Sequence, residues 1–161
     1  MHYQKCRYVK KTEVTYLGLN QLLTANTNYN LVTLLKALVA TSGTLAPFFN
    51  TSSDKMNVYA EDSSVLFKLS LSGAWTGTQT SNRSIQLDFV GTNGNRLTKS
   101  RDESVITDVI TLVSFFSVDA AGFLVNNGTA PILRSNGNNF TISEVTLIAE
   151  QVTTQTSISE K

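Results

Sequence analysis

Hydrophobic and polar residues alternate along much of the chain, and this alternation predicts antiparallel β-strands. A period of two places one face of a strand against a core and leaves the other face in water. The clearest segment is residues 65–76, where five apolar side chains share one parity: Val65, Phe67, Leu69, Leu71 and Trp75. We therefore expect this segment to be a strand with Trp75 in the core.

Residues 105–118 are apolar at both parities. A strand with two apolar faces must be covered on both, either inside a sandwich or against another subunit. Phe115 and Phe116 are adjacent, so their side chains point to opposite faces of this strand. We predict that one of them packs in the subunit core and that the other lies in the interface of an obligate homotrimer.

The remaining strands are expected at residues 58–60, 84–90, 96–98, 123–125, 132–135 and 140–149. In the last of these, the apolar parity changes between Ile142 and Val145. An extra residue in one strand of a pair restores the parity, so we predict a β-bulge near Ser143 or Glu144.

Asn-Gly dipeptides are typical of hairpin turns, because both residues tolerate a positive φ angle. The chain contains three of them: Asn93-Gly94, Asn127-Gly128 and Asn136-Gly137. Eight short strands with tight turns indicate a mainly β protein, a jelly-roll-type antiparallel β-sandwich, with one short N-terminal amphipathic helix.

That helix is expected over residues 30–41. Asn30 is suited to be its N-cap, and Gly43 can close its end in the left-handed region. A helix of about three turns is not stable alone in water, so its apolar face must pack on something. It either caps the open end of the β-sandwich or forms a threefold bundle with copies of itself. The face consists of Leu31, Leu34, Leu35, Leu38 and Val39.

Three regions are expected in the 161 residues. Residues 1–49 would form an N-terminal arm and short helix that serve as an attachment segment. Residues 50–152 would form the β-sandwich, and residues 153–161 a loose C-terminal tail of Thr, Gln and Ser. The boundary near residue 50 is placed at a polar connector.

The first charged residues are all basic: Lys5, Arg7, Lys10 and Lys11 precede Glu13. Such an arm is either a solvated tail or a segment that docks on an acidic surface. Four cationic contacts would give only weak, salt-dependent binding to nucleic acid, so nucleic acid is not expected as a partner.

Candidate chemistry is sparse. The only histidine is His2 and the only cysteine is Cys6, so neither a Ser-His pair nor a cysteine-rich metal site is expected. The carboxylates fall at turns or on wet strand faces, which favours solvation over an acid–base pair. We expect no enzymatic activity, no cofactor, no metal, no signal peptide and no membrane contact.

Three segments, residues 69–75, 114–128 and 140–151, look like the β-rich knobs of tailed bacteriophage virion proteins. Those knobs resemble tumour necrosis factor-like jelly rolls that assemble as trimers. The resemblance implies a structural protein of the virion, assembled in the host cytoplasm, with no catalytic residues.

The chain lacks the heptad shaft or triple β-helix that precedes a fibre knob. We therefore interpret it as a homotrimeric head-decoration or head-fibre component. In this interpretation Lys5, Arg7, Lys10 and Lys11 anchor it to the major capsid protein or another virion protein. The alternative is a receptor- or carbohydrate-binding knob of a phage tail fibre or needle, with a host surface glycan as its ligand.

Overall fold

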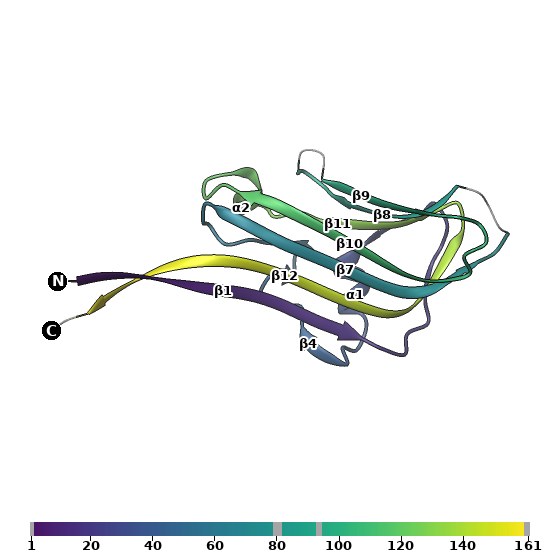
Figure 1. Ribbon diagram of the computed structural model, residues 1–161, viewed down its shortest axis with the longest axis horizontal. Helices are drawn as coiled ribbons and strands as arrows, with labels where there is room; N and C mark the ends of the chain where they lie inside the picture. Colours follow the sequence, from purple (N-terminus) through teal and green to yellow (C-terminus); the bar gives the residue numbers. More distant parts are fainter. Residues whose placement is uncertain (1, 79–81, 93–94, 160–161) are drawn as a thin grey trace.

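Two antiparallel sheets pack face to face in the computed structural model, which describes residues 2–78, 82–92 and 95–159 (Figure 1). The larger sheet has six strands in the order β10-β7-β12-β1-β4, with β2 paired to the start of β12. The smaller sheet has four strands in the order β3-β11-β8-β9. The protein is therefore a mainly β, antiparallel sandwich.

The strands of the larger sheet are β1 (His2–Tyr16), β2 (Gln21–Leu23), β4 (Ser42–Thr44), β7 (Ser63–Thr76), β10 (Thr107–Val118) and β12 (Asn139–Ser159). Those of the smaller sheet are β3 (Asn28–Asn30), β8 (Arg83–Phe89), β9 (Arg96–Arg101) and β11 (Pro131–Asn136). A short pair, β5 (Phe49–Asn50) and β6 (Lys55–Met56), and two helices, α1 (Leu31–Lys36) and α2 (Phe123–Asn127), complete the described elements.

The core lies between the two sheets and is rich in aromatic rings. Phe89 lies edge-on to both Phe67 and Phe116, with ring centroids 4.9 and 4.5 Å apart. Trp75 is 4% exposed and packs on Phe140, as its strand parity predicts. Edge-to-face aromatic pairs add stability beyond the area that they bury, so this line of rings fixes how the sheets sit on each other.

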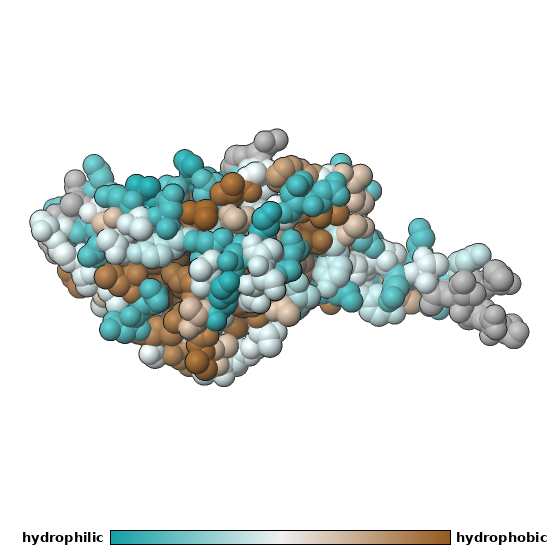
Figure 2. Space-filling view, turned by 180° about the vertical axis from the view of Figure 1, so that it is seen from behind, coloured by the Kyte–Doolittle hydropathy of each residue, from teal (hydrophilic) through white to brown (hydrophobic). Residues whose placement is uncertain are grey.

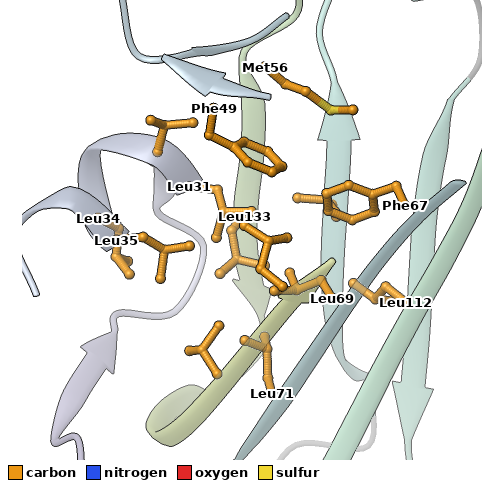
Figure 3. Packing of buried hydrophobic residues seen from close by; sticks show 14 of the residues in the cluster. Leu31, Leu34, Leu35, Phe49, Met56, Phe67, Leu69, Leu71, Leu112 and Leu133 are labelled. Carbon is orange, nitrogen blue, oxygen red and sulfur yellow. The ribbon is translucent and has the colours of Figure 1, made fainter. Parts of the chain in front are cut away.

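Helix α1 packs its leucines onto the same core (Figure 3). Asn30 is its N-cap, and the Asn30 side chain accepts hydrogen bonds from the N–H groups of Val32 and Thr33. The helix ends at Lys36, earlier than expected, and Gly43 belongs to β4 instead of closing it. The apolar face of α1 is thus used within one subunit, where it covers a side of the sandwich.

The N-terminal strand β1 pairs along its whole length with the C-terminal part of β12, from His2 opposite Ser159 to Tyr16 opposite Val145. Their outer halves extend past the body as a two-stranded ribbon that carries both chain ends (Figures 1 and 2). Residues 1–49 are therefore not a separate arm, because Val14 and Tyr16 of β1 lie in the common core. The expected loose tail is also wrong, because β12 continues to Ser159.

Several local predictions have mixed outcomes. The ladder between β12 and β7 shifts register between Ile142 and Glu144, which confirms the bulge. Residues 123–125 lie in α2 instead of a strand, and residues 58–60 form a loop.

Two of the three Asn-Gly dipeptides do not form the predicted hairpins. Asn136-Gly137 joins strands of different sheets, and Gly128, at φ 64°, ends α2. Neither of these dipeptides makes a hairpin, and Asn93-Gly94 lies outside the described residues.

Because Trp75 is enclosed, replacing Trp75 with Ala should leave a large cavity. We expect Trp75→Ala to lower the free energy of unfolding by about 3–5 kcal/mol. Thr76→Ala, at the exposed neighbouring position, should change it by less than about 0.5 kcal/mol. Urea titrations followed by circular dichroism would measure both. Equal stability of the two variants would show that the Trp75 ring is not part of the core.

Burial raises the pKa of the Tyr16 phenol above its ordinary value of 10.0. The unfolded chain then loses this proton at lower pH than the folded protein does, so stability is fully present below pH 10 and falls as pH rises toward the folded pKa. We expect the wild type to lose more stability than Tyr16→Phe between pH 9 and 11, as measured by urea unfolding at each pH. Parallel losses would contradict the prediction.

Candidate assembly surface

The outer face of the larger sheet, which points away from the core, carries two rows of aligned side chains. Four strands contribute to each row, because β10, β7, β12 and β1 lie side by side in register. One row is Val113, Lys68, Ile148 and Glu13. The next row is Phe115, Leu66, Glu150 and Lys11. We call this surface the outer face.

Most exposed large apolar side chains of the described strands share the parity of the outer face. Exposed apolar side chains that gather on one face of a protein mark sites of interaction. The seven residues are Tyr3 and Val9 on β1, Leu22 on β2, Val109, Val113 and Phe115 on β10, and Val152 on β12. The outer face is therefore the surface of the molecule best suited to bind another protein.

Phe115 and Phe116 point to opposite sides, as expected. Phe116 is 2% exposed and packs on Phe89 in the core, whereas Phe115 is 70% exposed on the outer face. A side chain that is enclosed within its own subunit cannot also form an intersubunit contact. Of the two residues named for a trimer interface, only Phe115 has the position for it.

The middle of the outer face is a flat row of small hydroxyl side chains, Thr111, Ser70, Thr146 and Thr15. The hydroxyl oxygens of Ser70 and Thr111 are 3.3 Å apart, within hydrogen-bond distance. Short side chains leave this part of the sheet level, so a second surface can approach it closely. The row separates the apolar side chains at one end of the sheet from those at the other.

The charges on the outer face are balanced. The Lys11 ammonium lies 2.6 Å from Glu13 Oε2 and 3.5 Å from Glu150 Oε1. The hydrogen bond and charge of Glu13 raise the pKa of Lys11 above its ordinary value. With Lys68 these residues make two cations and two anions in two neighbouring rows, so the charges next to Val113 and Phe115 cancel.

The four predicted anchoring residues lie along β1, so they do not form a free basic arm. Lys5, Arg7 and Lys11 have the parity of the outer face, and Lys10 points the opposite way. The Lys10 ammonium lies 5.7 Å from the centre of the Tyr59 ring. The structure thus spreads these cations over two faces instead of bringing them together.

At the other end of the sandwich, an arginine that was not expected to be buried holds a loop. Arg83 is 1% exposed, and its guanidinium lies 5.3 Å from the centre of the Trp75 ring. It donates to the carbonyl oxygens of Asp102 and Val105, between β9 and β10. Hydrogen bonds from the Ser104 hydroxyl and N–H to the Asp102 carboxylate lower the pKa of Asp102.

This packing also bears on sugar binding, since an exposed Trp75 ring could have stacked on a sugar. With Arg83 on one side and Phe140 on another, Trp75 is enclosed. The carboxylates of Asp88 and Asp108 are engaged by Arg96 and Arg101. Within residues 2–78, 82–92 and 95–159, no three histidine, cysteine or acidic side chains are placed to hold a metal ion.

An apolar groove of about 760 Å³ lies between α1 and β4. Leu35 and Leu38 of α1, Val14 of β1 and Leu45 line it. Figure 2 shows apolar side chains gathered on this side of the molecule.

None of the helices that the structure describes is long and apolar enough to cross a membrane.

Residues 8–151 match the family described as the Sf6-type phage tail needle knob or tip of some Caudovirales. This match covers most of the chain, including all of the strands except the outer ends of β1 and β12. The chain belongs to this family. It is therefore a structural virion protein of a tailed phage, and its β-sandwich is a needle knob.

The tail needle protein of Shigella phage Sf6 is 48% identical to the knob over 143 residues. The matched region covers 88% of this chain and 50% of that protein, so the knob spans half the length of its relative. The PRD1 vertex protein P5 superposes with a TM-score of 0.49 at 14% identity, over 88% of this chain and 94% of that chain.

These findings correct the main functional interpretation. The family match and the Sf6 relative favour the alternative, a knob of a phage tail needle, over a head-decoration or head-fibre component. The lack of a heptad shaft in these residues is no evidence against a tail needle, because the matched region is half of the Sf6 tail needle protein.

Removing the Arg83 guanidinium should release the loop that it holds. We expect Arg83→Met, which keeps an apolar side chain, to cost about 1–3 kcal/mol of stability, because two carbonyl oxygens lose a charged donor. Arg96→Met, which breaks an exposed ion pair, should cost less than about 1 kcal/mol. Amide hydrogen exchange of residues 102–106 should accelerate only in Arg83→Met. Unchanged exchange there would mean that the loop does not depend on Arg83.

Proposed function

We propose that the knob is a non-enzymatic module that assembles as a homotrimer through its outer face. The observation that carries the proposal is the position of the exposed apolar side chains, seven of which share this face. Copies that associate through it would remove Val113 and Phe115 from water, and the charges in the same two rows, Lys11, Lys68, Glu13 and Glu150, balance one another. The polar outer side of the smaller sheet would remain exposed.

The free edge of strand β10 favours a closed ring of three copies over a dimer. β10 is 12 residues long and, among the strands that the structure describes, pairs with β7 alone, which leaves its other edge without a partner strand there. A long edge strand with exposed apolar side chains is prone to uncontrolled association unless it is covered. If the β10 edge of one copy lies across the outer face of the next, two different surfaces meet, and such head-to-tail contacts form a ring when the rotation between copies closes.

The jelly-roll description belongs to the same proposal. Strands β10-β7-β12-β1 face strands β3-β11-β8-β9, and the chain crosses between the sheets after β7, β9, β10 and β11. Eight strands divided in this way support a double-sheet jelly roll. The Val113 and Phe115 surface is then the outward side of one of its two four-stranded layers.

A capsid-anchoring role for Lys5, Arg7, Lys10 and Lys11 is not included in the proposal. β1 is bonded to β12 along its whole length, and Lys11 is paired with Glu13 and Glu150. A segment committed to its own sheet cannot also extend as an arm toward another protein.

Substitutions at Phe115 and Phe116 test the assembly. We expect light scattering at micromolar concentration to give a trimer mass for the wild type. Phe115→Asp should give a folded monomer, since a charge on the outer face opposes close contact between copies. Phe116→Asp should unfold the protein, because it buries a charge in the core.

Thr98→Asp is the matched control, because Thr98 is exposed on the outer side of the smaller sheet. It should remain a folded trimer, as circular dichroism and light scattering would show. A monomer mass for the wild type, or a Phe115→Asp variant that still forms trimers, would refute assembly through the outer face.

A further inference from the structure

The ribbon formed by the outer halves of β1 and β12 has little support from the rest of the molecule. The ladder between β12 and β7 ends at Gln151 opposite Val65. Just beyond it, Glu61 Oε1 accepts a hydrogen bond of 2.6 Å from the N–H of Thr154. From there the described strands continue as two alone, and an isolated two-stranded ribbon is marginally stable in water.

One face of the ribbon is occupied at its base. Lys10 lies over the Tyr59 ring, and the Gln151 amide exchanges hydrogen bonds with the backbone N–H and C=O of Tyr59. Thr153 Oγ1 donates to the carbonyl oxygen of Tyr8. The loop around Tyr59 therefore covers this face where the ribbon leaves the body.

The opposite face carries an exposed pair of valines. Val9 lies directly opposite Val152, and these side chains are 62% and 43% exposed. The pair has the parity of the outer face and is the next step after Lys11 and Glu150. The valine pair thus lies on the same face as Phe115, one step beyond the row in which Phe115 and Leu66 align with the Glu150–Lys11 ion pair.

We propose that the Val9–Val152 pairs of three copies meet below the sandwich and join the three ribbons into a neck built from strands. This inference rests on the proposed homotrimer and extends its interface beyond the body. The occupant of the valine surface is a second and third copy of this chain, because the surface is continuous with the outer face. Contact with the other two copies would also give the ribbon the packing that an isolated two-stranded ribbon lacks.

The charges along the ribbon limit the neck to its base. Arg7 opposite Thr154 and Lys5 opposite Thr156 follow the valine pair at the same parity. Two-stranded ribbons twist more strongly than wider sheets, so successive pairs rotate around the ribbon axis. Arg7 and Lys5 are then turned progressively away from the other copies, toward water.

Cysteine cross-linking at adjacent positions tests the neck. In a Cys6→Ser background, Val9→Cys and Tyr8→Cys each place one thiol on the ribbon. Both parent side chains are exposed, but on opposite faces. After oxidation with copper phenanthroline, Val9→Cys should run at twice the chain mass on a denaturing gel, since one thiol per chain links two of three copies. Tyr8→Cys should lose this band.

Light scattering of the same samples before oxidation distinguishes a failure of the neck proposal from a failure of the homotrimer proposal. A trimer in which Val9→Cys does not cross-link, or in which Tyr8→Cys cross-links equally well, would overturn the neck and leave the homotrimer standing. Monomers throughout would overturn the homotrimer together with the neck. Val152→Cys, opposite Val9 on the same face, should repeat the Val9→Cys result and exclude an effect peculiar to one position.

Discussion

The 21-residue strand β12 holds the larger sheet together, and the rest of the fold depends on its pairing. It bonds to β7 along one edge and to β2 and then β1 along the other. A single register shift between Ile142 and Glu144 keeps Phe140 and Val145 on the core side of one strand. Without the bulge, half of β12 would turn its apolar side chains to water.

The strands that the sequence predicts best are those with one wet face. In β7, alternation alone places Trp75 in the core, and in β12 the change of parity places the bulge. β1 escapes prediction because its outer half alternates Lys and Arg with mixed residues and gains its order from a partner at the other end of the chain. Strand pairing between distant segments leaves no local signal.

The candidate surface could be predicted in part. Two apolar parities in residues 105–118 indicate that one side of β10 meets something outside the subunit core, but only the position of Phe116 against Phe89 decides which side. Arg83 could not be predicted, because nothing local separates a buried arginine from an exposed one. Its environment is made by Trp75 and by carbonyl oxygens from a distant loop.

Both chain ends leave the molecule along the same ribbon, and this arrangement determines how the knob bears mechanical load. A pull on the N-terminal end acts along β1, parallel to its length and across its hydrogen bonds with β12. The pairs from His2–Ser159 to Tyr16–Val145 then resist together in shear. A strand peeled sideways would lose the same bonds one after another, at lower force. The ribbon therefore gives the sandwich an attachment that is strongest along its own axis.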